Sequence, residues 1–499
     1  MQLLDLITIF IFALGIVIMG LSFSGKGRNM KSFFAAGGAV PWAMSGLSLF
    51  MGFFSAGTFV VWGSIAYSLG WIAISIQWTM AIAGFVVGFF IAPRWHKTSA
   101  LTVAEYITRR LGVNTQKTYT YLFLFISLFT TGSFLYPVAK IVEVSTGMPL
   151  DLCILLLGGF CIVYVAAGGL WAVVSTDVLQ FIILTAAVLI VVPLSFGRVG
   201  GVVNFIESIP ATYFNLVNGE YTIGFIIAFG VYNAIFLGGN WAYVQRYASV
   251  NSQSSARKVG FLFGGLYVVS AVLWMLPPMI YRIVNPSLST IDAEGAYLMM
   301  CKEVLPAGLL GLMLSGMVFA TASSLNATLN ISSGVVTNDI FKRLFPQSSD
   351  KTLMRVARIS TIIFGLLAII VALLIPLMGG IVNVVISVAA LTGVPLYLPI
   401  IWTLFSKRQT EYSVITTTLV SLGANAFFKF ITPLWGFGFN RAEEMIVGVA
   451  FPVFCLIAFE LYYKLNHKIS HRYVEYQEWE KENNCIKETE RKEDKVMTE

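Results

Sequence analysis

Small and polar side chains recur along one apolar stretch of the sequence, residues 309–338, at the spacing of a single helix face. The stretch carries no charged residue before Asp339. In lipid, hydroxyl and amide groups on such a face must meet protein, water or a bound ion. The stretch therefore allows two interpretations, a close helix-packing face or a source of oxygen ligands within the membrane. The residues at steps of three or four are Gly316, Ala320, Ser323, Ala327, Asn330 and Gly334.

Two further apolar stretches contain residues that interrupt a helix. The segment 51–58 combines two glycines with the hydroxyls of Ser55 and Thr58, and each glycine costs a helix interior about 1 kcal/mol. We expect the helix to open there and to point backbone carbonyls into a cavity, as discontinuous transporter helices do to hold cations. A kinked packing helix is the alternative. The segment 229–246 has a similar interruption, with Asn233 and Asn240 seven residues apart and hence on one face.

Ionisable side chains are rare in the apolar stretches, and each suggests a specific role. Asp177 is the one carboxylate well inside such a stretch, and an acid in the membrane suggests a functional site. A structural acid, hydrogen-bonded near the inner end of its helix, is the alternative. Lys140 lies about one turn from Glu143, which favours a structural ion pair near the outer interface over a substrate contact. Gln77 is an uncharged polar group at depth, suited to bind a ligand or to hydrogen-bond a neighbouring helix.

The composition places these residues in an all-α integral membrane protein. The 499 residues are 57% hydrophobic and 11% charged, whereas a soluble domain carries about 25% charged residues. Runs long enough to span a bilayer predict about thirteen transmembrane helices. They cover residues 3–22, 42–69, 71–92, 118–145, 151–168, 170–195, 223–248, 259–284, 301–334, 355–377, 380–405, 412–432 and 444–465.

Basic residues predict the orientation of these spans. With the N-terminus outside, 26 lysines and arginines fall on the inside and 5 on the outside, in keeping with the positive-inside rule. The C-terminal segment 466–499 is then a charged, solvated cytoplasmic tail, part helical and part disordered. We expect the plasma membrane, a bacterial inner membrane, as the location. The net charge of +7 follows from this asymmetry and does not indicate a nucleic-acid partner.

Motifs of other functional classes are missing from the sequence. It has no phosphate-binding loop for ATP-driven transport and no selectivity-filter motif of a channel. No Ser-His-Asp or Cys-His arrangement at membrane depth supports catalysis, so we predict that the protein is not an enzyme.

The two interruptions lie five spans apart, which predicts an internal repeat. Broken helices at matching places in two five-helix units are typical of inverted-repeat secondary transporters. The predicted units are residues 42–195 and 223–405, joined by an extracellular loop at 196–222. A peripheral helix and cytoplasmic loop at 1–41 precede them, and two peripheral helices at 406–465 follow them.

Several segments together resemble the sodium:solute symporter family, which includes galactose, proline, pantothenate, sialic acid and sodium–glucose carriers. The resemblance covers roughly residues 1–465 and implies a LeuT-like inverted repeat with broken first and sixth core helices. The matching segments are 32–38, the Ser55 region, 102–106, 168–180, 240–247 and 305–341.

The resemblance implies a sodium site between the broken second span and the ninth span. Its ligands would be the carbonyls of Met51, Phe54 and Ala320 and the hydroxyls of Ser323 and Ser324, which suit a hard cation. The resemblance implies sodium as the coupling ion and no other cofactor.

Some family members bind a second sodium at the acid that matches Asp177, together with hydroxyls after the serine pair. Here those later positions are Asn326, which could ligate through its carbonyl, and Ala327, which has no side-chain ligand. Asp177 and Asn326 are therefore candidates for a second sodium site or a proton site.

The family's substrate pocket maps to Ser55, Thr58, Gln77 and Asn240, with the aromatic Trp241 and Tyr243 nearby. Gln77 and Asn240 resemble positions that contact sugar hydroxyls in sugar-transporting members. No arginine stands out at membrane depth to clamp a carboxylate, so we favour a neutral sugar-like solute over a sugar acid, amino acid or vitamin.

The predicted function is sodium-driven uptake of a small polar solute by alternating access. The predicted partners are the solute, sodium and the lipid bilayer, and we expect the protein to function as a monomer. Two alternatives remain: a proton-coupled symporter of the same fold that uses Asp177, and a non-transporting sensor or channel-like relative.

Overall fold

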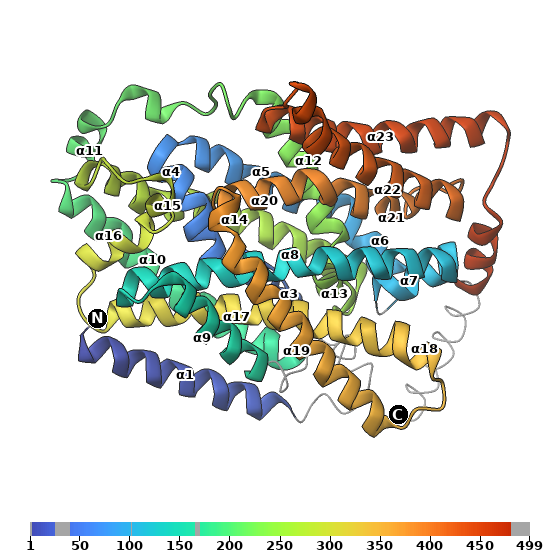
Figure 1. The fold of residues 1–499 in the computed structure, drawn as a ribbon, viewed down its shortest axis with the longest axis horizontal. Helices are drawn as coiled ribbons and strands as arrows, with labels where there is room; N and C mark the ends of the chain where they lie inside the picture. The colour runs from blue at the N-terminus through green and yellow to red at the C-terminus, as the bar shows by residue number, and fades with distance from the viewer. Residues whose placement is uncertain (1, 25–39, 101, 165–169, 481–499) are drawn as a thin grey trace.

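A computed structural model describes residues 2–24, 40–100, 102–164 and 170–480, and within these ranges every regular element is helical (Figure 1). Eight helices there are long and apolar enough to cross a membrane, and one bent pair makes a ninth span. The shorter apolar helices Leu3–Gly15, Trp42–Met51, Thr58–Leu69, Leu150–Gly159 and Leu309–Ala322 lie within predicted spans. The all-helical membrane class is confirmed, whereas the number thirteen stays a prediction.

The elements follow the chain in the order of the predicted spans. They are α1 (Leu3–Ser24), α3 (Trp42–Met51), η2 (Thr58–Trp62), α4 (Gly63–Leu69), α5 (Ile72–Val86), η3 (Val87–Ile91), α6 (Ala92–Lys97), α7 (Val103–Leu111), α8 (Val113–Thr146), α9 (Leu150–Tyr164), α10 (Leu170–Arg198), α11 (Val202–Ser208), η5 (Ala211–Phe214), α12 (Ile223–Gly239), α13 (Trp241–Ala248), α14 (Gln253–Val284), α15 (Thr290–Ala293), α16 (Ala296–Val304), α17 (Leu309–Val335), η6 (Val336–Phe341), α18 (Lys342–Leu344), α19 (Asp350–Leu374), η7 (Pro376–Met378), α20 (Ile381–Val388), η8 (Ala389–Gly393), α21 (Val394–Thr403), α22 (Glu411–Ala426), η9 (Phe427–Ile431), η10 (Thr432–Trp435) and α23 (Arg441–Leu465).

Helices from the two predicted repeats pack together in two groups. In one group α5 lies between α12 and α14, and α14 also packs on α3. In the other group α8 packs on α9, α17 and α19, while α1 lies along α17 and α10 (Figure 1). The candidate site lies where these groups meet.

Glycines bring α5 and α14 into close contact. A Cβ atom at Gly84 would lie 2.7 Å from the backbone nitrogen of Gly264. One at Gly260 would lie 2.6 Å from the Cα atom of Gly88. Gly84 of α5 and Gly88 of η3, which continues it, are four residues apart, as are Gly260 and Gly264 of α14. Each pair shares one face, as in small-residue contacts between membrane helices.

A carboxylate of α1 fixes the beginning of α17. Asp5 is 1% exposed, and its Oδ1 atom accepts hydrogen bonds from the backbone N–H groups of Gly308 (2.7 Å) and Gly311 (3.1 Å). Gly308 is the N-cap and has no side chain of its own for this purpose. Asp5 therefore caps α17 from another helix and complements the positive end of its dipole.

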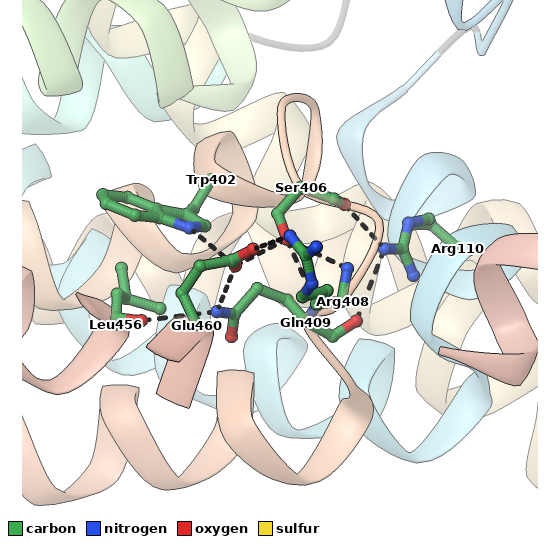
Figure 2. Close-up of polar contacts among 7 residues, drawn as sticks. All are labelled: Arg110, Trp402, Ser406, Arg408, Gln409, Leu456 and Glu460. Carbon is green, nitrogen blue, oxygen red and sulfur yellow. Dashed lines mark hydrogen bonds and ion pairs between the residues drawn. The ribbon is translucent and has the colours of Figure 1, made fainter. Parts of the chain in front are cut away.

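A polar cluster holds the turn between α21 and α22 (Figure 2). Glu460 of α23 accepts hydrogen bonds from Ser406 Oγ (2.6 Å), Arg408 Nη1 (3.2 Å) and Gln409 Nε2 (3.0 Å). From the other side, Arg110 of α7 donates to the backbone carbonyl of Ser406 at 3.0 Å. Burial lowers the pKa of Arg110, and the carbonyl groups offset part of that desolvation.

The C-terminal tail is attached to α7 over its first part. Residues 471–480 form a helix, in which the Tyr476 ring lies 5.8 Å from the ring of Tyr106 and Arg109 lies over the ring of Trp479 at 3.7 Å. Tyr476 is 7% exposed, whereas Arg472, Glu475 and Glu478 of the same helix are exposed, so this part of the tail is helical and contacts α7 through one face. Residues 481–499 lie outside the described ranges.

Candidate solute and sodium sites

The predicted interruption of the second span is present in the structure. Helix α3 ends at Met51, residues 52–55 form a turn, and the chain is helical again from Ala56, with a π-helical segment from Thr58. π-helical turns are frequent at functional sites. The backbone N–H of Ala56 donates to Thr321 Oγ1 of α17 at 2.9 Å. This bond connects the break directly to the ninth predicted span.

Four of the five predicted sodium ligands can be placed from this contact. Met51 and Phe54, each 1% exposed, lie at the break. Ala320 immediately precedes Thr321, and the Ser324 hydroxyl donates to the Ala320 carbonyl at 3.4 Å. The Ala56–Thr321 hydrogen bond therefore brings the break and α17 into direct contact, and the ligation of sodium by these groups stays a prediction.

Two predicted ion ligands, Ser323 and Asn326, have side chains outside the described residues. The backbone of both residues belongs to α17. Ion ligation thus stays a prediction. Sequence reasoning missed Thr321, although its hydroxyl stands two residues before Ser323 and was a visible signal.

A cavity of about 1100 Å³, here called the aromatic cavity, lies beside the break. Ser55, Thr58 and Gln77 line it, so three predicted solute contacts converge. Gln77 is 2% exposed, and its Nε2 atom has no hydrogen-bond partner within the described part of the chain. The described lining includes no charged side chain; its aromatic members are Phe53, Trp62, Phe134, Phe229, Tyr232, Phe236, Tyr243, Tyr267 and Tyr397.

The seventh predicted span is also broken, and the break separates the two asparagines. Helices α12 and α13 meet at Asn240 with a 60° bend. Asn240 Oδ1 accepts from the N–H of Ala242 at 3.0 Å, which makes Asn240 the N-cap of α13. Its Nδ2 atom donates to the Tyr397 hydroxyl at 3.4 Å.

The asparagine that lines the aromatic cavity is Asn233, not Asn240. Asn233 is 2% exposed, and its Nδ2 atom donates to Thr79 Oγ1 at 2.8 Å. Trp241 also lies elsewhere, because its ring stacks on that of Phe123 with centroids 4.6 Å apart. The structure thus places Asn233, rather than Asn240 and Trp241, with the other solute candidates.

A second cavity of about 820 Å³, here called the charged cavity, contains Asp177 and Arg246. Ser48 joins them, because its hydroxyl donates to Asp177 Oδ2 at 2.6 Å and accepts from Arg246 Nε at 3.2 Å. Asp177 is 4% exposed and Arg246 is 8% exposed. Pairing through a hydroxyl lowers the cost of burying both charges, so the alternative of a hydrogen-bonded structural acid gains support.

Arg246 requires a correction to the sequence analysis. The sequence predicts no arginine at membrane depth that could clamp a carboxylate. The structure instead places Arg246 in α13 and in the wall of the charged cavity, together with Ser324 and Asn240. The bend at Asn240 turns this helix end inward, which hydropathy does not reveal.

The two cavities meet at a layer of shared side chains. Gly52 of the first break and Phe236 and Tyr243 beside the second break line both cavities, as does Tyr397. Both helix breaks therefore border the aromatic cavity and the charged cavity. Such an arrangement can admit a ligand from either side in turn when the halves of the broken helices move.

One broken helix from each predicted repeat, with a pair of adjoining cavities at the two breaks, is the arrangement of a secondary transporter. The sodium:solute symporter family model matches residues 33–420, and the chain belongs to this family. It is therefore a multi-pass membrane protein related to sodium-coupled solute symporters, and not an enzyme.

Individual relatives agree with this assignment. The chain is 28% identical to a sodium/glucose cotransporter of Vibrio parahaemolyticus, over 86% of each protein. It is 25% identical to sodium/glucose cotransporter 1 of Mus musculus, over 91% of this chain and 76% of that one.

Solved structures share the fold. A sodium-coupled sialic acid symporter in a substrate-bound outward-open state aligns with a TM-score of 0.77 and 21% identity, over 92% of this chain and 98% of that one. A nucleobase-cation-symport-1 transporter aligns with a TM-score of 0.56 and 14% identity, over 90% and 99%.

Proposed function

We propose that the protein couples inward sodium flow to the uptake of a neutral polyhydroxy solute, such as a sugar or a cyclic polyol. The observation that carries this proposal is the lining of the aromatic cavity. Neutral hydrogen-bonding groups and aromatic rings surround the space, and none of the described lining residues is charged. Cavities of this kind bind ligands by apolar contact and orient them through a few polar groups.

Gln77 is the main hydrogen-bonding candidate in this cavity. Its buried, unpartnered amide N–H groups can donate to a solute hydroxyl, and a buried donor without a partner is unfavourable. Ser55 and Thr58 add hydroxyls to the lining of the same cavity, and Asn233 adds an amide. Relatives named for glucose and for myo-inositol transport support a solute with several hydroxyl groups.

Sodium would bind between the break of the second span and α17. In this proposal the carbonyls of Met51, Phe54 and Ala320 and the hydroxyls of Ser323 and Ser324 supply the oxygen ligands. A bound ion would hold the break against α17 beside Thr321 and stabilise the adjoining solute cavity. Each charge moved inward gains about 2.3 kcal/mol per 100 mV of membrane potential.

The orientation and location belong to the same proposal. The distribution of basic residues supports an N-terminus outside, a C-terminus in the cytoplasm and the plasma membrane as the location of the protein. With this orientation α7 and the charged cavity lie towards the cytoplasm, and α15 and α16 lie towards the outside.

Uptake by purified protein in liposomes tests the proposal. Neutral sugars and polyols are compared with sugar acids, amino acids and vitamins, each in sodium or in choline at fixed pH. We expect sodium-dependent uptake and countertransport of a neutral polyhydroxy compound. Uptake indifferent to the replacement of sodium would contradict sodium coupling, and preference for an anionic solute would contradict the assigned solute class.

A second candidate mechanism is proton coupling through Asp177, which is buried in the charged cavity. It predicts uptake that is stimulated by acid without sodium and is lost in Asp177→Asn. The same liposomes distinguish the two mechanisms when a pH gradient replaces the sodium gradient.

A further inference from the structure

One carboxylate is buried in the segment that joins α14 to α17. Glu294 lies between α15 and α16 and is 3% exposed, although its neighbour Asp292 is exposed. Figure 1 shows α15 and α16 at the end of the molecule opposite to α7. None of the predicted ion or solute contacts includes this residue, so its burial calls for another explanation.

Glu294 holds the beginning of α20. Its Oε1 atom accepts a hydrogen bond from the N–H of Ile381, the first residue of α20, at 2.9 Å. The N-cap of this helix is Gly380, which has φ = 89° and no side chain to cap the helix itself. A Cβ atom at Gly380 would lie 2.6 Å from Glu294 Oε1. Glu294 therefore supplies, from a distant segment, the acceptor that a helix N-terminus requires.

The other carboxylate oxygen contacts α8. The Tyr136 hydroxyl donates to Glu294 Oε2 at 2.8 Å, and Tyr136 is fully buried. On the same helix, Lys140 Nζ lies 2.8 Å from Glu143 Oε2, which confirms the ion pair expected from the sequence. The pKa of Glu294 is raised, chiefly because the carboxyl group is buried, and the charge of Glu143 acts in the same direction. The hydrogen bonds from the Ile381 N–H and the Tyr136 hydroxyl and the charge of Lys140 lower this pKa and so oppose the shift.

The same segment also touches the outer half of the broken second span. The ring of Tyr297, three residues after Glu294, lies 4.3 Å from the ring of Phe59 in η2. A cavity of about 220 Å³ between them is lined by Lys140, Glu294 and Val60, among others. The segment thus connects three elements, η2, α8 and α20.

These three elements form three sides of the aromatic cavity. η2 contributes Thr58, α8 contributes Ser133, and the continuous helix 381–403 contributes Val388 and Thr392. A change at Glu294 would therefore alter how these walls stand relative to one another, at the end of the cavity that faces away from α7.

We propose that Glu294 is a positioning residue that keeps the outer side of the solute cavity closed, by tying the beginning of α20 and α8 to the segment 290–304. The proposal rests on the proposed transport function and orientation, because it concerns access to the same cavity from outside. Loss of the carboxylate frees the first turn of α20 and lets solvent enter between α20 and η2.

Accessibility of an introduced cysteine tests this proposal without requiring transport. Val388→Cys places a thiol in the cavity wall, in a background from which the native cysteines have been removed. Sealed right-side-out vesicles are treated with a membrane-impermeant maleimide, and the labelling rate is measured with and without Glu294→Ala. We expect labelling to rise roughly tenfold, as loss of a charge-assisted hydrogen bond predicts.

Two further variants make the test specific. Glu294→Gln should label nearly as slowly as the parent, because its amide can accept from Ile381 and donate to the Tyr136 oxygen. Glu303→Ala removes a carboxylate of the same segment that pairs with Arg198 at 3.0 Å on the surface, and it should leave labelling unchanged. If Glu294→Ala fails to fold, Tyr136→Phe removes one of the two donors and should raise labelling in the same direction.

Unchanged labelling in folded Glu294→Ala would overturn the proposal, as would an equal increase in Glu303→Ala or labelling of Glu294→Gln as fast as that of the alanine variant. Solute uptake by the parent is measured separately. Absent uptake with the expected labelling pattern would contradict the proposed function and leave the role of Glu294 in closing the cavity supported.

Discussion

Gln77 combines burial with an unpartnered donor in the wall of the aromatic cavity. Gln77→Ala should raise the KM for the solute about tenfold, because one hydrogen bond to a bound solute contributes about 1 kcal/mol or more. The sodium concentration for half-maximal uptake should change less. Initial uptake rates over a range of solute and sodium concentrations measure both quantities.

Gln116 provides a matched control for this substitution. It is also a buried glutamine, at 4% exposure, but its Nε2 atom donates to Thr120 within α8. Gln116→Ala should leave the KM for the solute close to that of the parent. A similar rise in both variants would show that loss of a buried glutamine, and not of a solute contact, causes the effect.

The serine pair of α17 belongs to the proposed sodium site. Ser323→Ala combined with Ser324→Ala should raise the sodium concentration for half-maximal uptake by about tenfold or more, because two oxygen ligands are lost. Ser315→Ala is the control, since its hydroxyl lies in the same helix and donates to the Gly311 carbonyl at 2.7 Å. If the double variant has the same sodium dependence as the parent, the serine pair does not bind sodium and serves helix packing instead.

Thr321 connects the same helix to the break in the second span. Thr321→Val keeps the shape but leaves the buried N–H of Ala56 without its acceptor, which costs about 1–3 kcal/mol. We expect a lower Tm and weaker apparent sodium affinity, both restored in Thr321→Ser. Parallel thermal unfolding and uptake assays test this, and a Tm that Thr321→Val leaves unaltered would show that the hydrogen bond does not hold the break.

Individual residues show where sequence reasoning succeeds and where it fails. Gln77 was found because an amide at membrane depth is chemically conspicuous. Asn233 and Asn240 would share one face if the helix were unbroken. The 60° bend at Asn240 instead leaves Asn233 in the cavity wall and makes Asn240 a helix cap. Arg246 was missed for the same reason, because hydropathy records a charge at a helix end but not the direction of that end.

At the scale of elements, four glycines set the distance between α14 and the continuous helix formed by α5 and η3. Gly264→Val would force a branched side chain to within about 3 Å of the Ala81 carbonyl, and overpacking of this kind costs about 1–3 kcal/mol. Gly265 is the neighbouring residue of the same helix, and a Cβ atom there meets nothing within 4 Å. We expect Gly264→Val to lower the Tm by several degrees and Gly265→Val to change it little.

Thermal unfolding of the two purified variants tests this, since both make the same change in helix propensity, which from glycine to valine is slightly favourable. Equal changes of Tm in the two variants would mean that the close contact at Gly264 does not contribute to stability. The spacing of these glycines is visible in the sequence, but their partners are not, because α5 and α14 lie far apart in the chain and only the fold brings them together.

At the scale of the whole molecule, the helical class, the broken spans and the family followed from composition and motifs. The attachment of α17 by Asp5, the docking of residues 471–480 on α7 and the capping of α20 by Glu294 did not. Each of these depends on a contact between segments remote in sequence, and a polar residue near a helix end gives no sign of its distant partner.

Coupling between sodium and solute is a property of the whole molecule, and the structure suggests how it arises. The break at residues 52–55 borders the aromatic cavity and is bonded to α17, so an ion that orders the break also orders the solute site. Linkage requires the effect to be mutual: if sodium tightens solute binding by a given factor, the solute must tighten sodium binding by the same factor.

Binding of each ligand to the purified protein, measured at several fixed concentrations of the other, should therefore give equal ratios of dissociation constants. We expect a factor of about 5 to 150, the usual range for coupled sites, and a solute-induced rise in Tm that is large in sodium and small in choline. The Ser323→Ala, Ser324→Ala double variant should reduce the coupling factor and weaken sodium binding, whereas Gln77→Ala should weaken solute binding more than sodium binding. Solute affinity independent of sodium in the parent would show that the break and α17 do not transmit the effect of the ion.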